Sequence, residues 1–209
     1  MTDAKSKNDD SNTISGYRNC RGGGTVYVRT IIEPGGYFNK HRDKGRWGSW
    51  KHCSEGHHVM GMRLKIEPYQ RRGDNTALNA IRLTCTDGEE LVSAEQQWGD
   101  WLDFKWTTVD RKRTITAVQL RSEPHLGDSG GVQIIGSLDD TSANGVRFQD
   151  GYGWRYRPGD GFWGAWGDWA SCPAGTFIVG FRTYVVPHLG SGDDTALERV
   201  QFECGNHNP

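Results

Sequence analysis

Apolar side chains recur at every second position in several short segments of the chain, whereas long stretches with helical periodicity are absent. Residues 61–68, GMRLKIEP, and residues 180–187, GFRTYVVP, show this alternation most clearly. A period of two is typical of strands with one buried face. Because proline cannot donate to a strand ladder, the pattern predicts strands that stop before Pro68 and Pro187, and before Pro124 in a related segment.

A glycine-rich turn follows each of these segments, and a second alternating segment follows the turn. The second segments are AIRLTC at residues 80–85, VRFQ at 146–149 and VQFEC at 200–204. With 29 glycines and short apolar runs, the chain is predicted to be all-β. The tryptophan pairs of the repeats are expected to act as flat apolar plates in the interior between sheets, or alternatively to stack on the apolar face of a sugar.

The alternating segments belong to a longer internal repeat. Residues 47–85 and 166–204 align without a gap and place Trp, Cys, Gly, Pro, Asp and Thr at the same offsets. A second copy, at residues 98–150, carries two insertions and has Phe104 and Asp150 where the outer copies have cysteines. Three units of three or four strands predict three sheets about a pseudo-threefold axis.

Composition narrows the organisation and the partners. Residues 1–15 are polar and charged, so we expect a flexible tail ahead of a single domain at 16–209. The net charge is −1, with 25 Lys and Arg against 26 Asp and Glu, and no basic stripe predicts a nucleic-acid partner. No apolar run approaches the ~18 residues of a membrane span, and the N-terminus lacks the apolar segment of a secretory signal.

Four of the five cysteines occupy matching positions in the outer copies of the repeat. Cys53 and Cys85, like Cys172 and Cys204, are expected to form a disulfide within their own unit. Each bond would stabilise the fold by about 3–4 kcal/mol in the chain-entropy model. Disulfides indicate an oxidising compartment, so we expect an extracellular protein. Cys20 has no partner in this scheme and could be free or join two chains.

Two motifs that carry chemistry in other proteins are interpreted as loops. His52, Cys53, His57 and His58 could hold zinc, but the equivalent segment of the third copy keeps its cysteine and has no histidine. We therefore predict no metal and no cofactor. The string Gly-Asp-Ser-Gly-Gly around Ser129 resembles the nucleophile loop of trypsin-like proteases, yet no suitable His and Asp context precedes it. It is interpreted as a turn.

An Asp-Asx step precedes a threonine in each copy of the repeat. Asp and Thr side chains can hold a tight turn by bonding to backbone N–H groups, and carboxylates can also accept hydrogen bonds from sugar hydroxyls. Both interpretations stay open. The candidate carbohydrate-binding residues are Asp74, Asn75, Asp139, Asp140, Asp193 and Asp194.

The repeated unit closely resembles the vitelline membrane outer layer protein I family, over about residues 24–204. The most specific segments are DNTALNAIRLTC at residues 74–85 and DDTALERVQFEC at residues 193–204. The resemblance implies a secreted β-prism of three Greek-key sheets with pseudo-threefold symmetry, a shape shared with jacalin-type lectins. It also implies acidic residues near a central cavity and a weak transferase-like activity on chito-oligosaccharides.

Three functions follow as hypotheses. The first is a secreted β-prism that binds glycans or glycoproteins in an extracellular coat or secretion. The second is a structural or protein-binding element without a sugar site. The third is an enzyme acting on glycosidic bonds through a carboxylate pair such as Asp74 and Asp193. Because the same Asp recurs in every unit, a role in the fold is favoured over a single catalytic centre.

Overall fold

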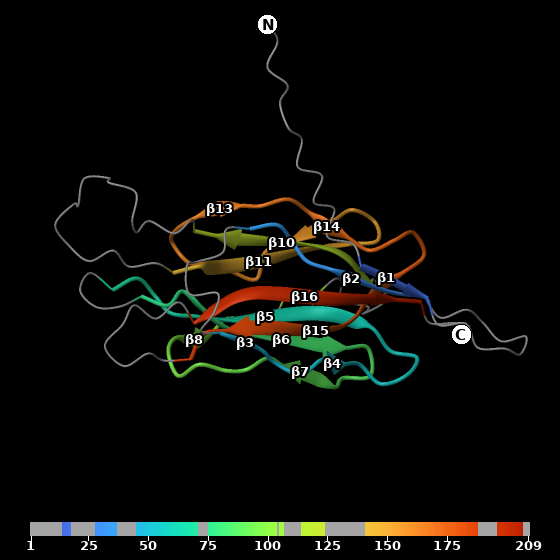
Figure 1. Cartoon of the computed structure of the whole chain (residues 1–209), viewed down its shortest axis with the longest axis horizontal. Helices are drawn as coiled ribbons and strands as arrows, with labels where there is room; N and C mark the ends of the chain where they lie inside the picture. The colour runs from blue at the N-terminus through green and yellow to red at the C-terminus, as the bar shows by residue number, and fades with distance from the viewer. Residues whose placement is uncertain are drawn as a thin grey trace, which may run out of the picture.

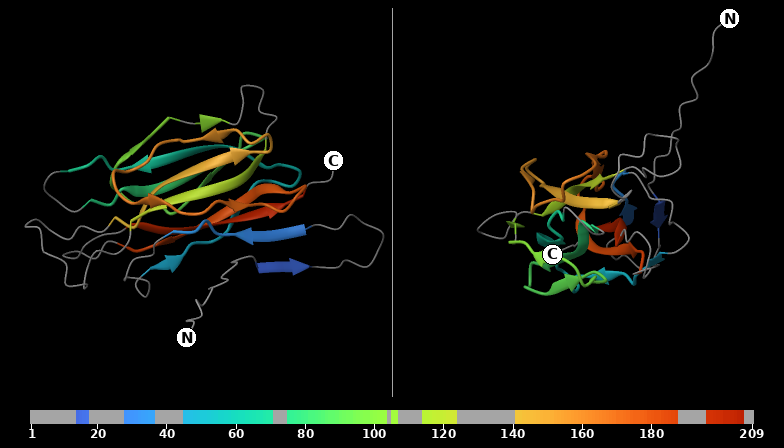
Figure 2. Two further views of the ribbon diagram at one scale, coloured as in Figure 1. Left: turned by 90° about the horizontal axis from the view of Figure 1, so that it is seen from above. Right: turned by 90° about the vertical axis from the view of Figure 1, so that its left-hand side faces the viewer.

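The computed structural model describes residues 14–17, 28–36, 45–70, 75–103, 105–106, 114–123, 141–187 and 196–206. Over these residues the chain forms strands and no helix (Figure 1). None of the described segments is a helix long and apolar enough to cross a membrane. The strands form three antiparallel Greek-key sheets around a pseudo-threefold axis, which together make a β-prism (Figure 2).

Each sheet is built around one long hairpin from one repeat unit. In the first sheet β5 (Val59–Ile66) pairs with β6 (Leu78–Cys85). In the second sheet β10 (Ile115–Ser122) pairs with β11 (Ala143–Asp150). In the third sheet β15 (Phe177–Val185) pairs with β16 (Leu197–Gly205). All three hairpins have register shifts at equivalent places near both ends, so the threefold symmetry extends to their bulges.

The lead strands of each unit pair with the hairpin of the preceding unit. β8 (Asp100–Trp101) and β9 (Lys105–Trp106) of the second unit lie along β5. β13 (Ala165–Trp166) and β14 (Ala170–Ser171) of the third unit lie along β10. β3 (Arg46–Trp47) and β4 (Lys51–His52) of the first unit lie along β15, which closes the ring.

The outer side of each hairpin carries one more strand. β7 (Glu90–Val92) borders β6, and β12 (Arg155–Tyr156) borders β11. The outer side of β16 is paired by β2 (Val28–Ile32), from the N-terminal part of the chain, with β1 (Ile14–Tyr17) beyond it. β1 thus begins two residues before the expected start of the domain; residues 1–13 of the expected tail lie outside the described part of the chain.

Strand pairing corrects the alignment of the second copy. Trp101 lies opposite Lys65 of the first hairpin. Trp47 and Trp166 hold the equivalent position on the other two hairpins, where they lie opposite Tyr184 and Arg121. The sequence alignment had placed Trp98 there, three residues earlier, so the expectation that Phe104 replaces the first cysteine is wrong. The second replacement is confirmed, because Asp150 pairs with Ile115 at the hairpin end where Cys85 pairs with Val59 and Cys204 with Ile178.

The prism interior contains aliphatic and phenylalanine side chains contributed by all three sheets. Phe148, Phe181 and Phe202 are fully buried there. None of the tryptophan side chains that the structure describes serves as an interior plate, contrary to the expectation from the sequence. Five of them are half-buried and stack with arginines that point outward from the hairpins; these are Trp47, Trp50, Trp101, Trp166 and Trp169. A guanidinium group on an indole face covers the outside of each sheet.

Glu203 links N-terminal strands to the last sheet at the place where the ring of sheets closes. This residue of β16 forms an ion pair of 2.8 Å with Arg29 of β2, and its other carboxylate oxygen lies 3.1 Å from His52 Nε2 of β4. Burial alone would raise the pKa of Glu203, but the hydrogen bond and charge of His52 and the charge of Arg29 together hold that pKa below its ordinary value.

We expect Glu203 to make the fold sensitive to acid. Because its pKa is lowered in the folded protein, its ionised form stabilises the fold above the unfolded pKa, and this contribution is lost as pH falls through the folded pKa. Glu203→Gln should lower the free energy of unfolding by about 1–3 kcal/mol at neutral pH, since charge-assisted bonds are lost. The variant should also lose less stability than the unaltered protein as the pH is lowered. Urea unfolding against pH measures this; an equal loss of stability in both proteins would contradict it.

Candidate functional site

Strands β5, β10 and β15 all finish at one end of the prism (Figure 2), and the described residues after β5 and β10 form a buried polar relay in each of those two units. Glu67 accepts hydrogen bonds from Thr76 N at 2.9 Å and Thr76 Oγ1 at 2.8 Å. Asn79 Nδ2 then donates to Thr76 Oγ1 at 2.7 Å. All three residues are buried, so the relay satisfies polar groups that would otherwise destabilise the fold.

The second unit repeats this relay, and the third rearranges it. Glu123 Oε2 accepts from Thr141 Oγ1 at 2.8 Å, and Asn144 Nδ2 donates to the same threonine oxygen at 2.6 Å. In the third unit Val186 holds the place of the glutamate, while the fully buried Glu198 holds the place of the asparagine. The buried carboxylate of the third unit therefore comes from the second strand of the hairpin, and not from the residue after the first strand.

All three units have a residue with left-handed backbone at this place, and in the first two it directly follows the relay threonine. Ala77, Ser142 and Ala196 have φ angles of 49°, 48° and 52°. Their carbonyl oxygens accept hydrogen bonds from the backbone N–H groups of Glu67, Glu123 and Val186. A left-handed non-glycine residue costs roughly 1–2 kcal/mol, so the relay has the physical role of holding this turn before the second strand of the hairpin.

An exposed aromatic cluster lies beside the relay of the first unit. It consists of Tyr69, Phe162 and Trp163, and we call it the aromatic cluster. The ring centroids of Tyr69 lie 5.7 Å from those of Phe162 and 5.2 Å from those of Trp163. Tyr69 is 50% exposed and Phe162 is 61% exposed, although both are large apolar side chains. Exposed apolar patches of this kind mark binding sites more often than single exposed rings do.

Contacts between units hold the aromatic cluster in place. Asn144 Oδ1 accepts a hydrogen bond from Trp163 N at 3.2 Å, and Asn144 O accepts from Gly161 N at 2.5 Å. A Cβ at Gly161 would meet Asn144 Oδ1 at 2.6 Å and the Ala77 Cβ at 3.0 Å, so only glycine allows this close approach. The relay of the second unit and the turn of the first therefore position the rings.

Arg121 fixes the other side of the segment that carries Phe162. Its guanidinium group donates to Gly161 O at 2.9 Å, Phe162 O at 3.2 Å and Gly164 O at 3.2 Å, and it pairs with Asp160. A guanidinium fork that bonds to several carbonyl groups restricts the backbone strongly. The two aromatic side chains consequently project from a segment that is held along its length.

Of the six residues predicted to bind sugar, the structure describes Asn75 alone. Its side chain is buried, with Oδ1 accepting from Gln70 N at 2.7 Å and Nδ2 donating to Gln70 O at 3.2 Å. This is the turn-holding role that the sequence left open beside sugar binding. The other five lie outside the described residues, so their sugar contact stays a prediction: Asp74, Asp139, Asp140, Asp193 and Asp194. Ser129 and Cys20 also lie outside them.

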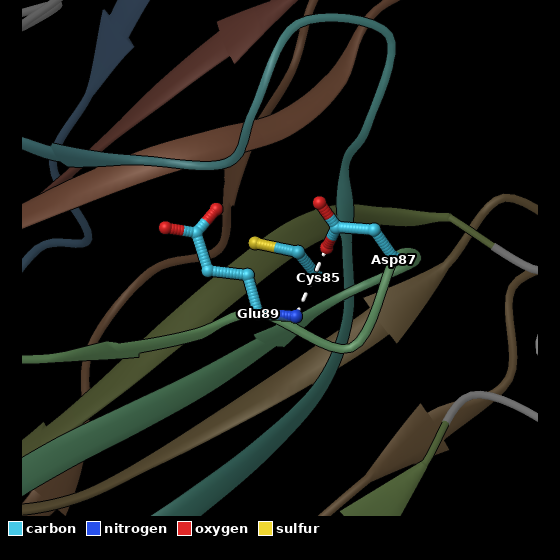
Figure 3. A group of neighbouring side chains, drawn as sticks. All are labelled: Cys85, Asp87 and Glu89. Atoms are coloured by element: carbon cyan, nitrogen blue, oxygen red, sulfur yellow. Dashed lines mark hydrogen bonds between the residues drawn. The ribbon is translucent and has the colours of Figure 1, made fainter.

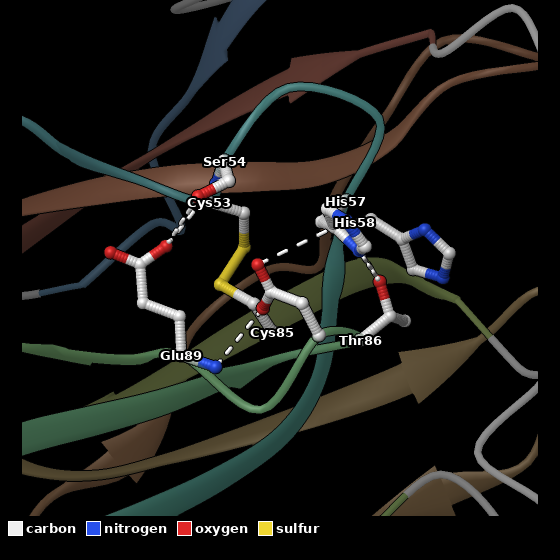
Figure 4. The surroundings of a disulfide bond; sticks show 8 residues. Cys53, Ser54, His57, His58, Cys85, Thr86 and Glu89 are labelled. Carbon is white, nitrogen blue, oxygen red and sulfur yellow. Dashed lines mark hydrogen bonds and ion pairs between the residues drawn. A yellow bond between two sulfur atoms is a disulfide. The ribbon is translucent and has the colours of Figure 1, made fainter.

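The opposite end of the prism carries both predicted disulfides. Cys53 is bonded to Cys85 and Cys172 to Cys204, each across a sequence separation of 32 residues. Around the first bond, Glu89 accepts from Ser54 N and Oγ, and His57 Nδ1 lies 3.0 Å from Thr86 Oγ1 (Figure 4). Cys53 and His57, two of the four residues considered as zinc ligands, are thus bonded to protein groups here.

One group of metal-type ligands occurs near that disulfide. Cys85, Asp87 and Glu89 have ligand atoms within 4.8 Å of one another, and Asp87 Oδ1 accepts from Glu89 N at 3.0 Å (Figure 3). A thiolate, rather than a disulfide sulfur, is the metal ligand that cysteine provides. Because the Cys85 sulfur is bonded to Cys53, two exposed carboxylates remain, which are fewer protein ligands than metal sites usually provide.

A shallow cleft lies between the third and first sheets. It has a volume of about 260 Å³, and its lining combines small residues such as Gly48 and Ser49 with Lys51, Phe181 and Arg182. Ligand sites usually measure roughly 300–1,000 Å³ and present accessible aromatic side chains, whereas this cleft is smaller and Phe181 is fully buried. The aromatic cluster therefore offers the better candidate site.

Three comparisons relate the chain to known proteins. A family model described as "Vitelline membrane outer layer protein I (VOMI)" matches residues 37–153 and 154–209. The human protein "Vitelline membrane outer layer protein 1 homolog" is 33% identical over 171 residues, 77% of this chain and 78% of the relative. The mouse protein of the same name is 33% identical over 171 residues, 77% and 79% of the two chains.

A solved structure shares the fold at low sequence identity. The structure of a prostate-specific WGA16 glycoprotein lectin superposes with a TM-score of 0.52 at 11% identity, covering 84% of this chain and 99% of that chain. At this identity the likeness concerns the fold alone. It agrees with the three-sheet prism described above.

Proposed function

Because the chain belongs to the vitelline membrane outer layer protein I family, we propose that it is an extracellular protein that binds carbohydrate through the aromatic cluster. The observation that carries the proposal is the exposure of Tyr69 and Phe162 on a segment held by buried hydrogen bonds. The two disulfides support the extracellular part, since such bonds persist in oxidising compartments.

The chemistry of the aromatic cluster suits a sugar ring. A pyranose presents C–H groups on one face, and these pack against an exposed aromatic ring, while the hydroxyl groups at its rim need polar partners. Tyr69 combines an apolar ring with a hydroxyl group, and Gln70 follows it beside the carboxylate of Glu67. The site is preformed, because the relay and Arg121 fix its backbone, so little ordering opposes binding.

Single substitutions in the aromatic cluster are expected to weaken glycan binding about tenfold, which corresponds to about 1.4 kcal/mol. Tyr69→Ala and Phe162→Ala each remove one exposed ring without opening the core. Binding to chito-oligosaccharides and to an array of N-glycans, measured at high protein concentration, gives the readout.

Two exposed aromatics at the other end of the prism provide matched controls. Tyr152 is 77% exposed and Trp154 is 65% exposed, so Tyr152→Ala and Trp154→Ala remove similar surface and should leave the affinity unchanged. Absence of binding to every sugar, or an equal loss in the control variants, would overturn the proposal. A protein ligand captured through Tyr69 and not displaced by sugars would support the alternative of a protein-binding element.

A further inference from the structure

The outer face of the second sheet carries arginines and tryptophans stacked in alternation. Arg155 lies 4.9 Å from the Trp169 ring centroid, and Arg147 lies 5.4 Å from the same centroid. Arg147 also lies 4.4 Å from the Trp166 centroid, and Arg157 follows at 5.9 Å from it. We call these five residues the arginine ladder. Its three guanidinium groups are separated by two indole rings.

Carboxylates neutralise only part of the arginine ladder. Asp160 forms a close ion pair with Arg157. Arg147 Nε instead donates to Gln119 Oε1 at 2.5 Å, and Arg155 Nε donates to Gln149 Oε1 at 3.1 Å. Among the described residues no carboxylate bonds to Arg147 or Arg155, so both remain cations with neutral partners.

The other two sheets balance their stacked arginines differently. On the first sheet Arg82 stacks on Trp101 and forms an ion pair of 3.0 Å with Glu90. On the third sheet Arg199 stacks on Trp47 and forms an ion pair of 2.6 Å with Glu33. Only the second sheet places two stacked arginines without an ion pair on the same indole, within the described part of the chain.

The crowding of these cations has an electrostatic cost. Burial lowers the pKa of Arg147, and the positive charges of Arg155 and Arg157 lower it further, whereas Asp160 acts in the opposite direction. An anion placed against the ladder would therefore relieve repulsion as well as gain attraction. A guanidinium group also matches planar oxyanions with two parallel N–H bonds.

We infer that the arginine ladder binds a sulfated polysaccharide, at a site separate from the aromatic cluster. Three guanidinium groups in a row fit an anion that repeats along a chain better than a single small ion, and Arg155 and Arg157 are exposed. The inference stands without the proposed function, because it rests on charge and the sugar site rests on exposed rings.

Nucleic acid fits this face less well. Proteins bind single strands by stacking bases on free aromatic faces, but Trp166 and Trp169 each already have two guanidinium groups stacked against them. The phosphates alone would then supply the attraction. An oligonucleotide of matched charge is consequently the informative competitor.

The test uses heparin as the probe and the full chain as the protein. We expect the double variant Arg147→Gln, Arg155→Gln to bind heparin at least tenfold more weakly. The slope of log affinity against log salt concentration should become shallower by about two, because two ionic contacts are lost. Desulfated heparin should not bind. Arg155→Gln alone, at an exposed position, gives a smaller loss and keeps the test valid if the double variant fails to fold.

Arg182→Gln is the matched control. Arg182 lies 4.6 Å and 4.8 Å from the Trp47 and Trp50 centroids and donates to Gln201 Oε1, so its surroundings copy those of Arg147 on another sheet. This control should bind heparin as the unaltered protein does, and so should Tyr69→Ala. Equal weakening by Arg182→Gln, an unchanged salt slope, or equally tight binding of the oligonucleotide would overturn the inference.

Discussion

Replacement of both Cys53 and Cys85 by serine is expected to lower the free energy of unfolding by about 3–4 kcal/mol. The bond closes a loop across a sequence separation of 32 residues, and it joins the residue after β4 to the end of β6. Without it the unfolded chain gains conformational freedom, while two polar hydroxyl groups enter a largely buried site. Denaturant unfolding of the variant against the parent protein measures the loss.

The symmetric bond provides the comparison for this experiment. Cys172 and Cys204 are joined across the same sequence separation of 32 residues, so the chain-entropy contribution should match within about 0.5 kcal/mol. If the first variant were as stable as the parent, or only the second variant lost stability, the loop-closure account of these bonds would be wrong. Glycan binding should persist in both, because the aromatic cluster lies at the other end of the prism.

Asp150→Ala is expected to destabilise the fold by about 3 kcal/mol or more. The carboxylate is fully buried, and Oδ1 accepts from Tyr152 N at 2.9 Å and Trp154 N at 3.0 Å, while Oδ2 accepts from Tyr156 Oη at 2.9 Å. Removing it leaves three donors without this buried acceptor, at roughly 1 kcal/mol or more each. Thermal and denaturant unfolding give the value.

Asp87→Ala is the control for this prediction. Asp87 lies in the equivalent turn of the first unit, where its exposed carboxylate accepts from Glu89 N at 3.0 Å. Its replacement should cost no more than about 1 kcal/mol. A similar loss from both substitutions would mean that the Asp150 carboxylate has no special part in the fold.

The two turns show how the second unit manages without a disulfide. Cys85 N donates to Glu89 O and Gly88 N to Cys85 O, and the same pattern joins Asp150 with Trp154 and Gly153. Gly88 and Gly153 have φ angles of +94° and +88°. The backbone of the turn is therefore retained, and hydrogen bonds to one carboxylate take the position of the covalent link.

Much of the fold could be predicted from the sequence because the same strand pattern occurs in each of the three repeat units. The hairpin strands, their ends near Pro68 and Pro187 and the pairing of four cysteines all follow from alternation and from matched offsets. These features depend on local backbone chemistry, which each unit repeats. A segment that is ambiguous in one unit can therefore be interpreted from its counterparts where the copies align without gaps.

The register of the second unit was missed for an equally local reason. The string WGDW occurs at residues 98–101 and again at 166–169, and identity of letters placed Trp98 first. Strand pairing instead makes Trp101 the counterpart of Trp166, since Asp100 lies opposite Ile66 and Ala165 opposite Ser122. Only pairing with the preceding hairpin separates the two alignments.

The aromatic cluster could not be found in the sequence because it is assembled between units. Tyr69 follows the first hairpin strand, whereas Phe162 and Trp163 precede the lead strands of the third unit. A signal was present, since Tyr69 takes a position that histidine holds in the other two copies. The arginine ladder was likewise hidden by a net charge of −1, which averages over all faces.

The exchange of lead strands between neighbours has a consequence for the ancestry of the molecule. Deleting one unit would leave the neighbouring hairpin with an unpaired edge, which invites association with other chains. Gain or loss of a single copy would therefore expose an unpaired strand edge. A circular permutation, which moves the chain ends but keeps the order of the units around the ring, would not. Each of the three hairpins depends on a neighbouring unit for strands that pair its edge, so we expect no single unit to fold alone.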